Sequence, residues 1–279
     1  MLTHYIINAL RNFLRYPGYS LINLFGLVLG LACSILIFLW VTDELAYNRY
    51  HTDNERVFKV MENQSYSDGS VSTDEYLPGF LYEKFKSEYP EVEVTARMDW
   101  SNDRLFKRGD LSTYEFGIYA DQTFFDALNI PLVEGNPNHP FPDNHSIAIS
   151  KRLAEKFFPN TVAVGNTFRL DNTEDFTVTA VYENRLGGNS FDEYEYVMPS
   201  DVSAWANGES AWLTTYVKLK DKNDQGLFDK KIKNLLKEQR KNINSELFLF
   251  SMEKWRLYSH FENGKQTGGR ITYVLSFSA

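Results

Sequence analysis

The side chains most often used in catalysis and metal binding are scattered along this chain of 279 residues. Only two of its five histidines, His139 and His145, share a segment, and at that spacing they would supply half of a metal site. Histidines beside prolines are usually solvated loop residues, so the metal site is the lesser alternative. Asp and Glu together number 37, too many for any one pair to stand out as acid and base.

Motifs for phosphate, zinc or nucleophile chemistry are missing. The chain has no G-x-x-x-x-G-K-[ST] phosphate loop, because Gly264-Lys265-Gln266 lacks both the leading glycine and the Ser or Thr. It also lacks H-E-x-x-H, C-x-x-C and G-x-S-x-G. We therefore predict no catalytic, cofactor-binding or metal-binding residue, no cofactor, and a protein that is not an enzyme and does not hydrolyse nucleotide.

The longest apolar segment, residues 21–41, determines where the rest of the chain must lie. Fourteen of its 21 residues are Leu, Ile, Phe or Val, and no charged side chain occurs from Tyr16 to Thr42. A helix needs about 20 residues at ~1.5 Å each to cross a ~30 Å hydrocarbon core. We predict a transmembrane helix at 21–41, with residues 42–270 on one side of the membrane.

Flanking charges predict the orientation of this helix. Arg11 and Arg15 precede it without any acidic residue, whereas Asp43 and Glu44 follow it directly. Basic flanks stay cytoplasmic, so residues 1–20 should be cytoplasmic and residues 42–270 extracytoplasmic. A cleaved secretory signal would have a shorter basic region and a small-x-small cleavage site. We therefore expect an uncleaved anchor.

Two further patterns belong to this N-terminal region. Apolar residues of the segment 1–20 recur at helical spacing, which predicts an amphipathic helix on the inner leaflet; a simple extension of the span is the alternative. Within the span, Gly26 and Gly30 form a G-x-x-x-G pattern, a weak indication of helix packing in the membrane.

The composition of the remaining residues limits the possible partners. Beyond Arg11 and Arg15 the chain holds 27 Lys and Arg against 37 Asp and Glu, a net charge of −10. Such acidity argues against nucleic acid as a partner. The only cysteine, Cys33, lies in the span, so the outer domain has no disulfide and must be held by its core.

Local patterns predict strands and helices that alternate without a regular βαβ repeat, which favours an α+β fold. A polar helix at 43–55, helices beginning at Pro78 and at Lys151, and one amphipathic helix through Phe228–Leu236 are expected. Predicted strands cover 57–61, 92–98, a hairpin around Gly109, 146–150, 176–182, 216–220 and a closing strand at 246–250. The proline-rich stretch 131–142 suggests a seam between two lobes, and Gly187-Gly188-Asn189 a flexible loop.

Several segments resemble FtsX-like/MacB-like ABC transporter permeases. The resemblance rests on Ile22–Leu27 with Gly30, Trp40–Leu45, Tyr47–His51, Glu55–Val60, Pro131–Pro137, Ser146–Ser150, Val164-Gly165-Asn166 and Phe176–Val181. Asn166 stands where many relatives have lysine and Ala180 where many have glycine, and neither change puts the family in doubt. The similarity implies a MacB-like periplasmic core domain of two α+β lobes behind the first of four membrane helices.

The resemblance also implies partners and a location. They are a cytoplasmic ABC ATPase, separate or fused, a second permease copy in a dimer, and a periplasmic adaptor or cargo, in the bacterial inner membrane. Relatives serve export, lipoprotein release or control of cell-wall hydrolases. If the resemblance holds, Leu10 and Phe13 on the amphipathic segment form a face that couples the span to the ATPase.

The end of the sequence leaves an alternative open. Residues 271–279 are apolar but too short for a span, and they stand where the family's second helix begins, so we expect a fragment of a longer permease or a truncated copy. A membrane-anchored sensor with an extracytoplasmic ligand-binding domain shares this topology. An anchored envelope enzyme is the least favoured, since it needs a catalytic constellation.

Overall fold

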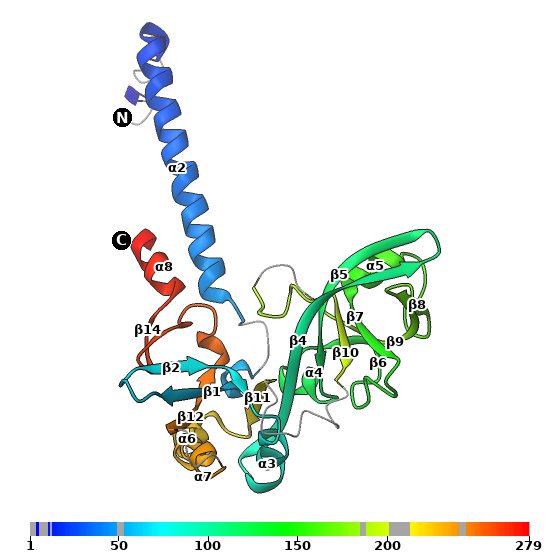
Figure 1. The fold of residues 1–279 in the computed structure, drawn as a ribbon. Helices are drawn as coiled ribbons and strands as arrows, with labels where there is room; N and C mark the ends of the chain where they lie inside the picture. Colours follow the sequence, from blue (N-terminus) through cyan, green and yellow to red (C-terminus); the bar gives the residue numbers. More distant parts are fainter. Residues whose placement is uncertain are drawn as a thin grey trace. The chain divides into compact units, whose positions relative to one another are not determined.

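A computed structural model describes residues 4–5, 11, 13–48, 53–184, 188–200, 213–239 and 244–278. The chain falls into two compact units, residues 1–45 with 272–279 and residues 46–271. The first, here the helical unit, contains helices alone among its described residues, and the second, the outer unit, contains the strands (Figure 1).

The helical unit consists of α2, Pro17–Ala46, and most of α8, Arg270–Ser278. Pro17 begins α2, where a missing N–H costs no helical hydrogen bond and the fixed φ suits the first turn. The most apolar window of α2 has a mean hydropathy of 2.6 and no buried residue, so α2 is long and apolar enough to cross a membrane. Trp40 and Phe277 join the two helices edge to face, with ring centroids 5.7 Å apart.

The predicted amphipathic segment 1–20 is described only at 4–5, 11 and 13–20, where every residue except Tyr16 is helical. Leu10 lies outside the described residues. The predicted polar helix at 43–55 is wrong in its extent, because α2 continues through Asp43 and Glu44 to Ala46 and a turn at 47–48 follows. A short 3-10 turn, η1, covers Asn54–Arg56.

One mixed sheet forms the centre of the outer unit, and its main strands follow the order β12-β1-β11-β4-β5-β10-β7-β9-β6. Most pairs are antiparallel, and β10 with β5 and β7 with β9 are parallel. The strands are β1 Val57–Ser65, β2 Val71–Asp74, β3 Tyr76–Leu77, β4 Val92–Arg108, β5 Leu111–Ala120, β6 Leu132–Gly135, β7 Ser146–Ser150, β8 Thr167–Leu170, β9 Glu174–Tyr182, β10 Tyr196–Pro199, β11 Leu213–Leu219 and β12 Asn244–Ser251. This mixed α and β architecture confirms the predicted fold class.

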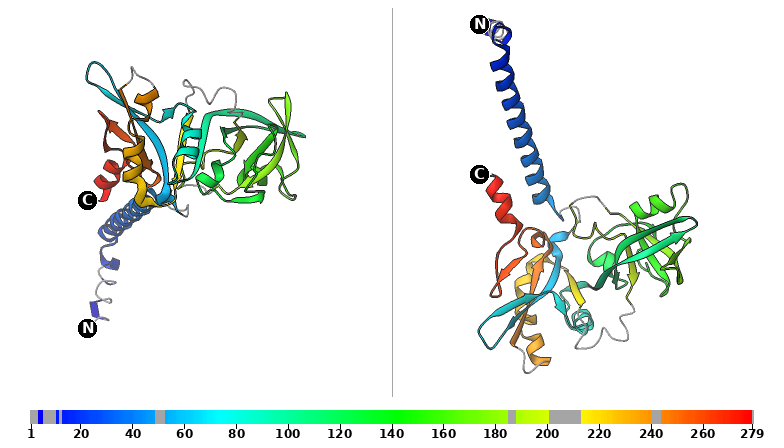
Figure 2. Two further views of the ribbon diagram at one scale, coloured as in Figure 1. Left: turned by 90° about the horizontal axis from the view of Figure 1, so that it is seen from below. Right: turned by 45° about the horizontal axis from the view of Figure 1, so that its top comes forward.

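The first lobe of the outer unit is built on β1, β11 and β12, with helices α3 Leu81–Glu88, α6 Gln225–Ile232 and α7 Leu235–Gln239. Their apolar faces form one core, in which Phe85 and Phe228 lie 5.8 Å apart. The predicted single helix through Phe228 and Leu236 is two helices, because the helix is interrupted at residues 233–234. Both lobes are visible at opposite ends of the sheet in every view (Figures 1 and 2).

The second lobe contains β5 to β10 and helix α5, Lys151–Phe157. The hydroxyl of Ser150 caps α5 by accepting a hydrogen bond from the Leu153 amide at 2.9 Å. All five residues of β7 are buried, so both faces of this strand are covered. Ile147 and Ile149 face the core under α5, and Ala148 belongs to the core on the opposite face.

That opposite core, here called the shared core, contains residues of both lobes. Helix α4, Phe124–Ala127, and the segment after β12 cover it. Aromatic rings dominate it, and Phe191 of the second lobe lies 5.9 Å from Tyr216 of the first. A continuous apolar core therefore joins the two lobes.

The predicted lobe seam at 131–142 is not where the chain passes between lobes. The long strand β4 runs from the first lobe into the second, and β11 pairs with it in the first lobe again. Residues 131–142 instead carry β6, the strand at the end of the sheet. Prolines are tolerated at such an edge because no neighbouring strand requires their missing N–H.

The helix predicted from Pro78 begins only at Leu81, and most predicted strands are confirmed with longer bounds, among them the hairpin of β4 and β5. Its two-residue loop places Gly109 at φ +59°, the conformation that a tight hairpin turn requires at its first central position. The predicted closing strand is β12, but a small hairpin follows it, formed by β13 His260–Glu262 and β14 Lys265–Gly268. Gly187 of the predicted flexible loop lies outside the described residues.

Candidate functional site

The predicted helix-packing glycines lie on one face of α2. Apart from the nearby backbone of α2 itself, no described atom lies within 4 Å of a Cβ added at Gly26 or Gly30, so this face has open space beside it. Ser34 donates a hydrogen bond to the Gly30 carbonyl at 2.9 Å. Phe13, predicted for coupling to an ATPase, is 41 % exposed, and its predicted neighbour Leu10 is not described. Helix packing and coupling at these residues stay predictions.

The histidine pair is not brought into a ligand set. The His145 ring stacks against Phe176 at 5.4 Å between centroids, and both His139 and His145 are exposed. Among the residues that the structure describes, no group of three His, Cys, Asp or Glu side chains is placed to hold a metal ion.

Asn48, near the beginning of the outer unit, makes several hydrogen bonds. It is 1 % exposed and lies in the left-handed region at φ +62°, which asparagine tolerates better than other residues with a side chain. It directly follows the last turn of α2 and Tyr47. Its position fixes the first residues of the outer unit.

Hydrogen bonds connect Asn48 to two distant parts of the chain. Its amide N–H donates to the Gly188 carbonyl at 2.5 Å, and its Oδ1 accepts from the Ser190 amide at 2.9 Å. The side-chain Nδ2 donates to Ser190 Oγ at 3.0 Å and to the Met252 carbonyl at 3.2 Å. Asn48 thus joins the beginning of the outer unit to the second lobe and to the segment after β12.

Tyr47 adds two contacts to the same two regions. Its hydroxyl donates to the Asn189 carbonyl at 2.8 Å. The guanidinium of Arg256 lies 4.2 Å from the centre of its ring, in the geometry of a cation–π contact. Both residues after α2 are therefore attached to segments 188–191 and 252–256.

The chain leaves the outer unit at the same place. The Ile271 amide, at the beginning of α8, donates to the Leu257 carbonyl at 3.0 Å. Gly269, at φ +142°, packs so closely that an added Cβ would lie 2.7 Å from the Leu257 oxygen and 2.9 Å from the Ser259 nitrogen. We call this set the junction: residues 47–48, 188–191, 252–259 and 269–271.

The junction is anchored in the shared core. Trp255 donates its indole N–H to the Phe250 carbonyl at 2.8 Å and lies 5.5 Å from the Tyr216 ring. Phe191 contacts Trp255 at 6.2 Å and Phe124 at 5.6 Å. Burial raises the pKa of Tyr216 well above the usual phenol value, so this ring stays neutral. Packed rings therefore connect the junction to residues of both lobes.

The sequence signal for the junction is slight. Residues 47–51 were noted only for their resemblance, and a lone asparagine after a helix has the pattern of any loop residue. Among its described residues no group of three His, Cys, Asp or Glu side chains is placed to hold a metal ion. The junction can hold the two ends of the outer unit and its two lobes together.

Comparison with known families and structures gives one family match. Residues 20–235 match the model of the MacB-like periplasmic core domain. No curated protein matches the chain by sequence.

Solved structures share the fold at low sequence identity. A domain assigned to a permease protein of Porphyromonas gingivalis is 15 % identical, with a TM-score of 0.60 over 81 % of this chain and 98 % of that one. The periplasmic region of MacB from Actinobacillus actinomycetemcomitans is 16 % identical, with a TM-score of 0.52 over 72 % and 91 %. The extracellular domain of the noncanonic ABC-type transporter YknZ from Gram-positive bacteria is 13 % identical, with a TM-score of 0.50 over 70 % and 99 %.

Proposed function

The chain belongs to the family of the MacB-like periplasmic core domain, and we propose that it is the permease subunit of an ABC transporter of the FtsX/MacB type. In this proposal a partner ABC ATPase on the cytoplasmic side hydrolyses ATP, and the chain carries the resulting motion to its outer unit. The chain itself catalyses no reaction and needs no cofactor.

The junction is the observation that supports this proposal most directly. A lever needs its moving arms attached to a rigid body at a defined point, since a loose linker would absorb the motion. Here the residue pair after α2 and the residues at the beginning of α8 are bonded to the same segment, 252–257. That segment is held in the shared core of both lobes by Trp255.

The location follows from the family and from α2. A MacB-like periplasmic domain behind an apolar helix fits a membrane-anchored protein with an extracytoplasmic domain. We propose the bacterial inner membrane, with the N-terminus cytoplasmic because Arg11 and Arg15 precede the span and Asp43 and Glu44 follow it.

Partner contacts are assigned within the same proposal. Leu10 and Phe13 would transmit motion of the ATPase to α2, and Gly26 and Gly30 would face another helix, such as that of a second permease copy. A periplasmic adaptor or a cargo would meet the outer unit. Export, lipoprotein release and envelope signalling are all compatible with such a lever.

The test uses the protein expressed from its own locus. Affinity purification after cross-linking in intact cells should recover an ABC ATPase. Recovery of a signalling kinase in its place would favour the membrane-anchored sensor. The complex is then spin-labelled at Leu111 and Leu227, which are exposed on the second and first lobe, with Cys33 replaced by Ser. ATP with vanadate should change the distance between the labels, and an unchanged distance through the cycle contradicts the lever.

A further inference from the structure

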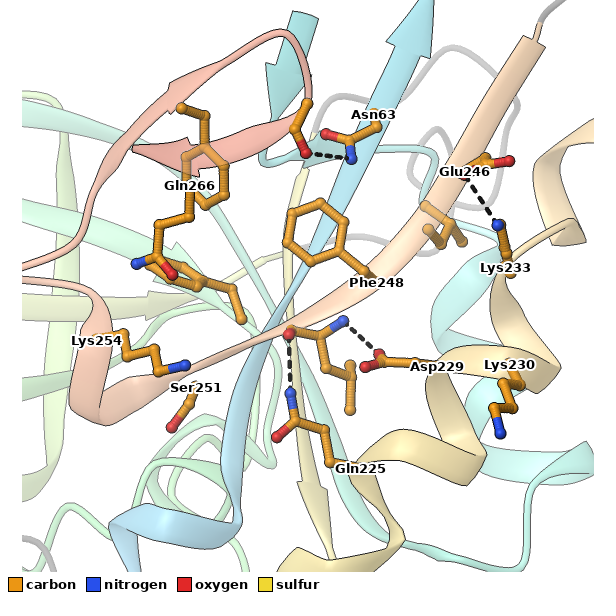
Figure 3. Close-up of a pocket in the computed structure, with 15 residues that line it drawn as sticks. Asn63, Gln225, Asp229, Lys230, Lys233, Glu246, Phe248, Ser251, Lys254 and Gln266 are labelled. Atoms are coloured by element: carbon orange, nitrogen blue, oxygen red, sulfur yellow. Dashed lines mark hydrogen bonds and ion pairs between the residues drawn. The ribbon is translucent and has the colours of Figure 1, made fainter. Parts of the chain in front are cut away.

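A cavity of about 400 Å³ lies in the first lobe and borders the junction at Lys254. Strand β12, helix α6 and the hairpin of β13 and β14 line it, together with Asn63 of β1 (Figure 3). Its volume is within the ~300–1,000 Å³ typical of small-molecule sites.

Aromatic rings form one wall of the cavity. Phe248 and Phe250 project from the same side of β12, and Phe261 of β13 packs against them at 5.9 Å and 5.3 Å between ring centroids. Phe250 is buried, but Phe248 and Phe261 are only half-buried. An apolar ligand that covers these two rings would remove apolar surface from water, which is favourable.

The hairpin wall is fixed in place before any ligand binds. Asn63 donates to the Gly264 carbonyl at 3.0 Å and accepts from Thr73 Oγ1 at 2.7 Å. Gln266 donates to the Tyr258 carbonyl at 2.9 Å. Because these polar side chains already hold the hairpin on the sheet, little ordering is left to oppose binding.

Both carboxylates that line the cavity are engaged with protein groups. Asp229 accepts a hydrogen bond from the Leu249 amide at 2.7 Å, and burial raises its pKa. Glu246 pairs with Lys233 at 3.3 Å and with Lys237 at 3.2 Å. The charge of Glu246 is therefore matched within the protein, and a further cation in the cavity would face only Asp229.

Lys254 supplies that further cation. Its ammonium group is exposed, has no hydrogen-bond or ion-pair partner among the described residues, and points into the cavity beside Ser251 (Figure 3). Lys230 at the α6 rim is also exposed and has no such partner in the described part of the chain. Unpaired cations beside apolar rings favour an anionic ligand with an apolar body.

We propose that this cavity binds a small molecule with a flat apolar body and a carboxylate, the class of the aryl carboxylates. The body covers Phe248 and Phe261, and the carboxylate accepts charge-assisted hydrogen bonds from Lys254. Lys254 and Met252 belong to the same 3-10 turn, η3, so the ligand contacts an element that also bonds Asn48 at the junction.

The probe is 2-naphthoate, titrated by equilibrium dialysis against the full chain in lipid nanodiscs, with empty nanodiscs subtracted. The neutral analogue 2-naphthalenemethanol measures the apolar contribution alone. We expect saturable binding of naphthoate and about tenfold weaker binding to Lys254→Gln, since the charged hydrogen bond is lost. Binding of the neutral alcohol should be the same in both proteins.

A matched control is Lys222→Gln, because Lys222 is an exposed lysine paired with Glu55 and does not line the cavity. Phe248→Ala should weaken both probes, and its melting curve shows whether the fold is retained. Equal naphthoate affinity in wild type and Lys254→Gln, or no saturation above empty nanodiscs, overturns the proposal. Neither experiment involves ATP or an ATPase, so this site and the permease function can fail independently.

Discussion

The two units use the same apolar residue types in opposite ways. In α2, Leu29 is 59 % and Phe38 66 % exposed, whereas in the first lobe Leu77 is 0 % and Phe58 1 % exposed. Exposed apolar surface of this extent is costly in water and favourable in hydrocarbon. The apolar side chains of α2 therefore need an apolar environment outside this chain, whereas those of the outer unit are covered by the protein's own core.

The largest expected effect breaks the core of the outer unit. Phe106 is fully buried and lies 5.1 Å from both Phe168 and Tyr196. Phe106→Ala should lower the free energy of unfolding by about 3–5 kcal/mol, because it removes apolar contacts and leaves a cavity. Urea unfolding in nanodiscs, followed by tryptophan fluorescence, measures this.

Phe38→Ala is the matched control in α2, where the ring is exposed. It should leave the urea midpoint of the outer unit unchanged, although it removes the same atoms. A comparable loss of stability in both variants would mean that the two units do not differ in how they are stabilised.

A charge in the middle of α2 should have the next largest effect. Leu31→Arg should make membrane insertion less favourable by about 2.5–3.5 kcal/mol. Leu111→Arg, at an exposed position of the β4–β5 hairpin, should change neither insertion nor folding. Carbonate extraction of membranes measures the anchored fraction, and full retention of Leu31→Arg would argue against α2 as a span.

Substitutions at asparagine sharpen the comparison at the boundary between the units. Asn48 and Asn172 both have positive φ, 62° and 59°, but Asn48 is buried in a hydrogen-bond network while Asn172 is exposed. Asn48→Ala should lower the free energy of unfolding by about 2–3 kcal/mol, because the buried partners of its side chain lose their hydrogen bonds. Asn172→Ala should lower the free energy of unfolding by about 1 kcal/mol, because only the unfavourable positive φ of alanine contributes there.

Urea unfolding measures the stability of both asparagine variants. Equal losses of stability would contradict a structural role of Asn48 beyond its backbone conformation. In the ATPase complex, Asn48→Ala should also reduce the ATP-dependent distance change while hydrolysis continues. Asn172→Ala should leave that change intact. Normal motion in Asn48→Ala would exclude the junction as the path of coupling.

The smallest effect concerns two carboxylates of the first lobe with opposite pKa shifts. Burial raises the pKa of Asp229, although the Leu249 amide acts against it. A raised pKa contributes stability that is present below the ordinary aspartate value and is lost as the pH rises through the folded pKa. Asp229→Asn should therefore abolish a loss of stability that begins near pH 4.

The contribution of Glu246 to stability should change with pH in the opposite direction. Partial burial would raise its pKa, but hydrogen bonds from Lys237 and Lys233 lower it overall. Its stabilisation is present above the ordinary glutamate value and is lost as the pH falls through the folded pKa, with an effect below about 1 kcal/mol at this exposed position. Urea midpoints from pH 3 to 7 distinguish the two, and parallel profiles for Asp229→Asn and Glu246→Gln would contradict both assignments.

Local patterns predicted most elements and missed most contacts. The helix over Leu81 and Phe85 and the strand through residues 176–182 follow from spacing within a few neighbouring residues. The break between α6 and α7 and the burial of both faces of β7 do not, because they depend on what packs there. The proline-rich stretch was mistaken for a seam, since prolines mark sheet edges as well as linkers.

Of the site residues, the sequence pointed to Gly26, Gly30, Leu10 and Phe13, all in or near the span. It missed Asn48, Trp255 and Lys254. A buried asparagine cannot be distinguished from a solvated one by residue type. Met252 and Ser190, which form hydrogen bonds with Asn48, are more than 140 positions away along the chain. Nothing local distinguishes them.

The sequence by itself determined the anchor and the composition of the outer unit, which has no cysteine and an excess of acidic residues. These properties depend on residue type, run length and nearby charges, all of which act locally. Tertiary structure alone decided that β1 lies between β11 and β12, and that both ends of the outer unit contact residues 252–257. Such pairings depend on contacts between residues far apart in the chain, whose free energy exists only once the core has formed.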